Sequence, residues 1–121
     1  MVNKNMKKIL SGIPASPGKA EGIAKTVFNP EEAINEITEN DILVTPMTDP
    51  NFVVAMIKAK GIITDFGGML CHAALVAREL GKPCIVGTKN ATKVIQNGQK
   101  ILMDGTKGEI YIFEEENYDF R

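Results

Sequence analysis

The fold of this chain is indicated most clearly by residues 64–83, which read TDFGGMLCHAALVARELGKP. Two adjacent glycines, Gly67 and Gly68, stand near its start, and a helix-like segment at 72–80 follows them. Gly81 and then Pro83 close that segment, which is the usual pattern at the end of a helix. The stretch therefore predicts a loop around the paired glycines, a helix over 72–80 and a stop before the apolar residues 84–86.

Short apolar segments continue on both sides of this stretch and alternate with turns. The strands that we expect are 20–28, 41–45, 62–64, 84–86, 100–103 and 109–113. The helices that we expect are 51–60, 72–80 and 91–95, with a helical turn or loop at 31–37. Residues 12–19 are rich in proline and glycine and predict a loop. Because the strands are short and outnumber the helices, the sequence predicts a compact mixed α/β domain.

The composition limits the class of protein. The chain has 121 residues, of which 44% are hydrophobic, and this suits one globular domain with a core. We place that domain at 12–113, between a polar tail at 1–11 and an acidic tail at 114–121. The net charge of −1 does not fit a nucleic-acid binder. No apolar run reaches the roughly 20 residues of a membrane helix, and no signal peptide is recognisable, so we expect a cytoplasmic protein.

His72 is the only histidine, and it stands at the start of the predicted helix, just after Gly67 and Gly68. Glycines let an anion approach the loop backbone closely. A helix N-terminus adds unpaired N–H groups and partial positive charge. The same charge favours the neutral imidazole, which keeps a lone pair free. These features predict a histidine that accepts and passes on a phosphoryl group, although a lone histidine is more often structural.

Two other hypotheses stay open at this point. Cys71 lies at the helix N-terminus, where thiolates are stabilised, so a thiol-dependent site is possible. The second hypothesis is that the chain is a non-catalytic interaction domain. Cys71, Cys84 and one histidine show no metal-ligand spacing, so no metal site is predicted. Residues 12–20 resemble a nucleotide-binding P-loop only superficially, because they have one residue too many between the glycines and Ala20 where Ser or Thr should hold magnesium.

The pattern Thr64-Asp-x-Gly67-Gly68-x-x-x-His72-Ala-Ala-x-Val-Ala-Arg78-Glu-x-Gly-x-Pro resembles the signature of a known family. It is similar to the phosphohistidine swivelling domain, the mobile domain of phosphoenolpyruvate synthase, pyruvate phosphate dikinase and the rifampin phosphotransferases. Residues 12–18, 41–44 and 104–108 resemble other parts of that domain. The resemblance covers about 12–111 and implies a compact swivelling β/β/α phosphohistidine domain of the α/β class, with His72 as the phosphorylated residue.

The resemblance also implies a carrier function within a phosphotransferase. The histidine would shuttle a phosphoryl group between an ATP-grasp nucleotide-binding domain and a phosphoenolpyruvate, pyruvate or other acceptor domain, in cis or in trans. No cofactor is expected on this chain, and ATP and Mg²⁺ are expected on the partner domain. No nucleic-acid or membrane partner is expected.

We assign roles to five residues besides His72. Thr64, Gly67 and Gly68 match the family's loop and are given a phosphate-binding role, with Cys71 and Arg78 as possible supporting residues. Arg78 lies six positions after His72, off its helix face, which favours a structural salt bridge over phosphate contact. Leu70 stands where the dikinases and synthases commonly have threonine, so the subfamily and the final acceptor stay open.

Overall fold

The computed structural model of the chain describes residues 5–114. The strands of this part are β1 (Asn5–Ser11), β2 (Ile13–Ser16), β3 (Lys19–Thr26), β4 (Asp41–Thr45), β5 (Gly61–Thr64), β6 (Cys84–Val86), β7 (Lys100–Asp104) and β8 (Glu109–Glu114). Its helices are α1 (Pro30–Glu36), α2 (Val53–Lys58), α3 (His72–Leu80) and α4 (Ala91–Val94), with a 3-10 turn, η1 (Pro50–Phe52). No helix within residues 5–114 is long and apolar enough to cross a lipid bilayer.

All eight strands belong to one mixed sheet, in the order β1-β8-β7-β3-β4-β5-β6-β2. The central strands β3, β4, β5 and β6 run parallel, and the outer pairs run antiparallel. Helices α1, α2 and α3 connect the parallel strands in turn. The carboxyl ends of parallel strands lie at one edge of a sheet, where ligand sites of α/β proteins form. The loops that follow β4, β5 and β6 therefore meet at that edge.

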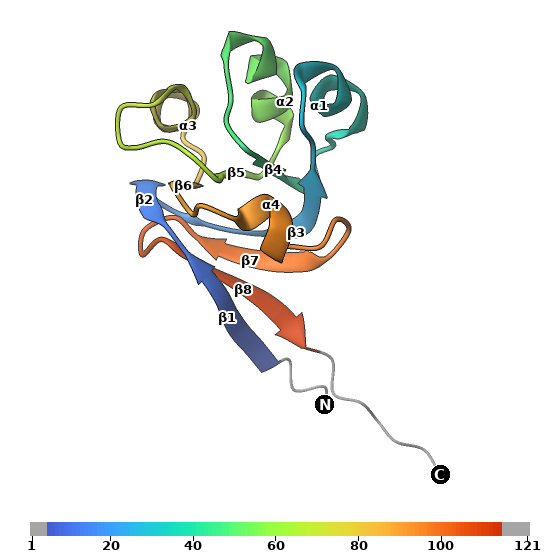
Figure 1. The fold of residues 1–121 in the computed structure, drawn as a ribbon, viewed down its shortest axis with the longest axis vertical. Helices are drawn as coiled ribbons and strands as arrows, with labels where there is room; N and C mark the ends of the chain where they lie inside the picture. Colours follow the sequence, from blue (N-terminus) through green and yellow to red (C-terminus); the bar gives the residue numbers. More distant parts are fainter. Residues whose placement is uncertain (1–4, 115–121) are drawn as a thin grey trace.

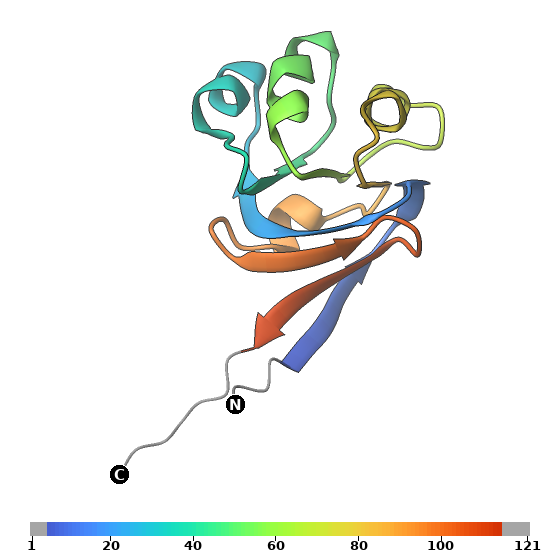
Figure 2. The same cartoon turned by 180° about the vertical axis from the view of Figure 1, so that it is seen from behind.

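Each face of the central strands contributes to a separate core. Leu43, Ile62 and Val86 pack with the buried residues of α1, α2 and α3. Ile42, Ile63 and their neighbours on the opposite face pack instead with α4 and with the buried side chains of β7 and β8. In Figures 1 and 2 the three helices lie together on one side, whereas β7, β8 and β1 curl away on the other. The predicted α/β class with β/β/α layering is confirmed.

The structure differs from the sequence-based expectations near the N-terminus. Asn5–Ser11, expected within a polar tail, form strand β1, in which Lys8 pairs with Tyr111 of β8. Ile13–Ser16, expected as a loop, form β2 against β6. Pro14 is compatible with β2 because β2 is an edge strand with a register shift at that residue. The rest of the expected tails, residues 1–4 and 115–121, lies outside the described residues.

The remaining elements agree closely with expectation. β4, β6 and α3 have the predicted limits. The helix expected at 51–60 is shorter and begins as the 3-10 turn η1, which Asp49 caps by accepting a hydrogen bond from the Asn51 N–H at 2.8 Å. It ends at Lys58, where the Lys82 ammonium group donates to the carbonyls of Ile57 and Ala59.

Candidate functional site

His72 is held at the carboxyl edge of the sheet because α3 begins with it. Cys71 is the N-cap residue in an extended conformation, and its N–H donates to the Gly68 carbonyl at 3.1 Å. This bond closes a tight turn over 68–71 directly before the helix. The Cys71 side chain makes no capping hydrogen bond, so the N–H groups of the first turn are left for other acceptors.

The imidazole of His72 is anchored through one nitrogen only. Its Nδ1 lies 2.8 Å from Oγ1 of Thr48, in the loop after β4. Thr48 is 8% exposed, whereas His72 is half-buried. Within residues 5–114 no hydrogen bond involves the other ring nitrogen, Nε2. The ring is therefore fixed in orientation and keeps one nitrogen available.

A small pocket adjoins the imidazole. Its volume is about 100 Å³, and it is lined by Met47, Thr48, Phe66, Gly67, Cys71, His72 and Ala73. At about 30 Å³ for each water in the liquid, this is room for roughly three waters. The pocket therefore has room for a phosphoryl group. No Asp, Glu, Lys or Arg side chain lines this pocket.

The glycine loop approaches this pocket through Gly67. Gly67 has a φ of 125°, and a Cβ there would lie 2.7 Å from the Cys71 sulfur. Both features require glycine. Gly68, by contrast, has nothing within 4 Å of a Cβ and does not line the pocket. Of the residues that the sequence indicates, the structure brings Gly67, Cys71 and His72 together.

Thr64 and Arg78 support the loop from outside the pocket. Thr64 is fully buried, and its hydroxyl donates to the Phe66 carbonyl at 2.7 Å. The Arg78 guanidinium donates through Nη1 to the Ala15 carbonyl at 3.1 Å and through Nη2 to the Met69 carbonyl. The salt bridge expected for Arg78 is not among those formed within residues 5–114. Arg78 instead links the loop to β2 through backbone oxygens.

Thr48 and Asp65 were not identified as site residues from the sequence. The Asp65 carboxylate accepts hydrogen bonds from the backbone N–H (2.9 Å) and the hydroxyl (2.6 Å) of Thr92. It is 5% exposed and ties the start of the glycine loop to α4. Asp65 directly follows β5, and Thr48 lies in the loop just after β4. Both therefore lie at the carboxyl edge of the parallel strands, and this position in the sequence could have identified them as candidates.

The two thiols lie in different surroundings. Cys84 is buried in the core, and this burial, with a smaller contribution from Cys71, raises the pKa of its thiol to about 12. Cys71 is half-buried and lines the pocket beside His72. Among residues 5–114 no group of three or more His, Cys, Asp or Glu side chains is arranged to hold a metal ion.

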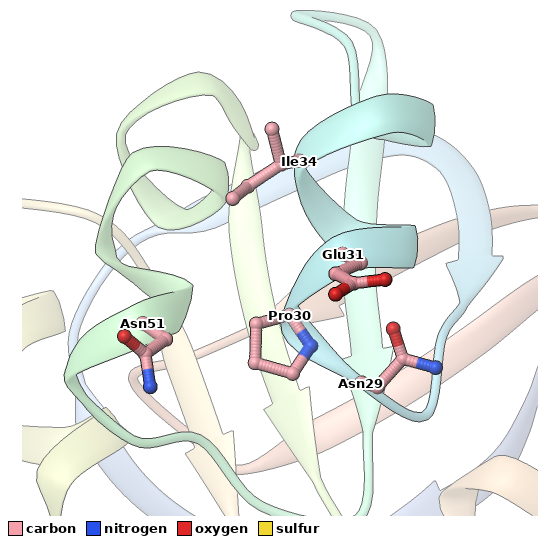
Figure 3. A pocket seen from close by; sticks show the side chains of 5 residues that line it. All are labelled: Asn29, Pro30, Glu31, Ile34 and Asn51. Atoms are coloured by element: carbon pink, nitrogen blue, oxygen red, sulfur yellow. The ribbon is translucent and has the colours of Figure 1, made fainter.

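A larger cleft lies between the start of α1 and η1. Its volume is about 510 Å³, and Figure 3 shows its lining residues, Asn29, Pro30, Glu31, Ile34 and Asn51. None of them is a residue that the sequence indicates for the site. The Asn29 side chain is already engaged, because it accepts a hydrogen bond from the Glu32 N–H at 2.9 Å. No histidine or cysteine lines this cleft, so the candidate nucleophiles His72 and Cys71 line only the small pocket.

Known proteins are similar to this chain in sequence and in fold. Residues 37–108 match the family described as PEP-utilising enzyme, mobile domain. The chain is 53% identical over 105 residues to a probable phosphoenolpyruvate synthase of Archaeoglobus fulgidus, covering 87% of this chain and 14% of that protein. It is 44% identical over 102 residues to the rifampicin phosphotransferase of Bacillus subtilis, covering 84% and 12%.

A solved structure extends the comparison to the fold. The N-terminal domain of Enzyme 1 - Nitrogen superposes with a TM-score of 0.69 at 12% identity, covering 86% of this chain and 93% of that one. The chain spans about one seventh of the curated relatives that it matches, which are large multidomain proteins. The match over residues 37–108 includes the glycine loop, Thr48 and His72. The chain belongs to the mobile-domain family of the phosphoenolpyruvate-utilising enzymes.

Proposed function

We propose that this chain is a phosphoryl carrier in which Nε2 of His72 is transiently phosphorylated. The observation that carries the proposal is the 2.8 Å contact between Nδ1 and Thr48, which occupies one ring nitrogen and leaves the other available. The adjoining pocket has room for a phosphoryl group. The open N-terminus of α3 lies at the same point and supplies N–H donors for an anion.

The geometry supports attack by Nε2. In the tautomer protonated at Nδ1, the Nδ1–H donates to the Thr48 hydroxyl oxygen, and Nε2 keeps its lone pair. That lone pair forms a P–N bond while the bond from phosphorus to the leaving oxygen breaks, and the oxygen keeps the bonding pair. The ring gains positive charge, so the hydrogen bond to Thr48 becomes charge-assisted. In delivery, an acceptor oxygen that is deprotonated at its own site attacks phosphorus, and the P–N electrons return to Nε2.

The donor and acceptor sites belong to other domains in this proposal. The chain corresponds to 14% and 12% of the two relatives, whose names are those of a phosphoenolpyruvate synthase and a rifampicin phosphotransferase. We assign the donor site to an ATP-grasp domain that holds ATP and Mg²⁺. The acceptor site then holds phosphoenolpyruvate, pyruvate or another acceptor, in cis or in trans.

The chain should become phosphorylated by potassium phosphoramidate, a small donor that needs no partner. The expected product is stable in base, labile in acid, and phosphorylated at Nε2 of His72, because Thr48 occupies Nδ1. Phosphorus NMR with a histidine-selective two-dimensional proton–nitrogen spectrum identifies the nitrogen. Attachment at Nδ1, or to the sulfur of Cys71, would contradict the proposal.

Thr48→Val should slow the phosphorylation of His72 about 10- to 100-fold, because a hydrogen bond to a charged group contributes about 1.5–3 kcal/mol. Valine keeps the shape of threonine but has no oxygen to accept from Nδ1–H. Thr48→Ser keeps the oxygen and is the matched control, with a rate close to that of the unaltered chain. Rates are followed with phosphoramidate by phosphorus NMR. Equal rates for the valine and serine variants would remove Thr48 from the mechanism.

A further inference from the structure

Negative charge is concentrated in one part of the chain. Residues 26–57 contain six acidic side chains and no basic one, although the whole chain has 14 basic and 15 acidic residues. Three of the six accept hydrogen bonds from backbone N–H groups inside the fold: Glu32, Asp41 and Asp49. The other three are exposed and form none of the salt bridges within residues 5–114: Glu31, Glu36 and Glu39. This part of the surface therefore attracts positive charge.

The cleft between α1 and η1 brings apolar surface into this acidic part. Pro30 and Ile34 give the cleft its apolar lining, and Ile34 is 42% exposed. Figure 3 shows the Ile34 side chain extending from α1 toward the neighbouring helical segment, which carries Asn51. Within residues 5–114 neither the Glu31 carboxylate nor the Asn51 side chain forms a hydrogen bond. The cleft thus combines an apolar lining with polar groups that are free to bind.

We propose that this cleft is the docking site for a basic amphipathic helix of another protein segment. Its apolar side chains enter the cleft against Ile34, and Lys or Arg side chains beside them face Glu31. No strand lines the cleft, so the partner cannot bind by extending the sheet, and a helix held in the groove is the remaining mode. Charge complementarity selects the partner, because an acidic segment would be repelled. This inference is independent of the proposed function.

The docking site is separate from the site of His72. The cleft and the small pocket share no lining residue. In Figure 1, α2 stands between α1 and α3, the helix that begins with His72. A helix bound in the cleft therefore leaves His72 accessible, and we expect phosphoramidate to react with the docked chain as fast as with the free chain.

The helix α3 supplies a matched control for each side chain. Leu75 is 46% exposed, close to the value for Ile34, and both are helical. Glu79 resembles Glu31, because both are exposed, helical and outside the salt bridges of residues 5–114. Neither control residue lines the cleft. The variants for the test are Ile34→Gln and Glu31→Gln, with Leu75→Gln and Glu79→Gln as their controls.

The test is a titration of the isotope-labelled chain with an amphipathic peptide of leucine and lysine, about 14 residues long so that it can form a helix. Two-dimensional proton–nitrogen spectra locate the contact and give the dissociation constant. A second peptide with glutamate in place of lysine tests the requirement for positive charge. Each titration is repeated with the four variants, at low and at high salt.

We expect the largest shifts at residues 29–36 and 49–54 and none of that size at 66–80. Ile34→Gln should weaken binding about 10-fold, as for a central apolar anchor. Glu31→Gln should weaken it about two- to fivefold at low salt, and this difference should vanish at high salt. Both control variants should stay within about twofold of the unaltered chain. The glutamate peptide should bind at least about 10-fold more weakly than the lysine peptide.

Four results would overturn the docking proposal. The lysine peptide may fail to bind, or its largest shifts may lie at 66–80 or be spread over the whole chain. Equal losses in Ile34→Gln and Leu75→Gln would remove the cleft as the apolar anchor. Equal binding of the two peptides would remove selection by charge. A slower reaction of His72 with phosphoramidate in the presence of the peptide would place the peptide over His72 instead.

Discussion

His72→Gln should reduce phosphorylation of the chain to background, with potassium phosphoramidate as the donor. Glutamine is polar and similar in length, so it can still contact Thr48. Its amide nitrogen has no available lone pair, because that pair is delocalised into the carbonyl, and no P–N bond forms. The α3 N-terminus and the glycine loop remain in place. Label incorporation is measured on the intact protein by mass spectrometry, together with a thermal unfolding curve to verify folding.

The control for this prediction is Cys71→Ser. Cys71 is the N-cap residue of α3 and lies beside the histidine, so its replacement tests whether a thiol is the acceptor. Serine is itself a favourable N-cap residue, and the helix should be unaffected. Full labelling of Cys71→Ser is expected. Label that persists in His72→Gln, or that disappears in Cys71→Ser, would favour the thiol hypothesis over the carrier.

Gly67→Ala should destabilise the chain by about 2–3 kcal/mol and slow phosphorylation, whereas Gly68→Ala should do neither. At Gly67 an alanine is strained by the φ of 125°, at a cost of about 1–3 kcal/mol. Its Cβ would also lie 2.7 Å from the Cys71 sulfur, so the turn that carries His72 must shift. Urea unfolding and the phosphoramidate rate are the two measurements.

Gly68 is the matched control for this loop. It is the next residue in the chain, and a Cβ there meets nothing within 4 Å. Gly68→Ala should therefore change the free energy of unfolding by less than about 0.5 kcal/mol. Similar losses of stability in both variants would contradict this prediction. They would show that the loss of backbone flexibility, and not the positive φ of Gly67, lowers the free energy of unfolding.

The elements that could be predicted from sequence are those with local signals. Both limits of α3 were predicted correctly, because Gly81 and Pro83 mark its end in the sequence. In the structure Gly81 adopts the left-handed conformation, with φ 68°, that ends helices. β1 and β2 were missed because their signals are not local. Lys8 pairs with Tyr111 and Pro14 pairs with Ile85, and neither partner can be inferred from the polar or proline-rich segment itself.

The site residues also divide into those with a local sequence signal and those without one. His72 and Gly67 are close in sequence and could be associated through the loop and helix start. Thr48 precedes His72 by 24 residues, and the two meet because β4 and β5 pair in parallel, with Thr45 opposite Thr64. The motif likewise did not reveal that Arg78 binds backbone carbonyls, because this depends on where β2 lies. Residues brought together by strand register require the three-dimensional structure.

The pairing of β1 with β8 has a practical consequence. Asn5 pairs with Glu114 at the end of this two-stranded ribbon (Figure 1). The first and last residues of the described part therefore lie about 5 Å apart. If residues 5–114 were inserted into a loop of another protein, that loop would be opened at a single point. The two ends of the opened loop would not have to move apart. Residues 5–114 therefore have both of their ends at one place, which suits the insertion of this segment into a loop of another protein.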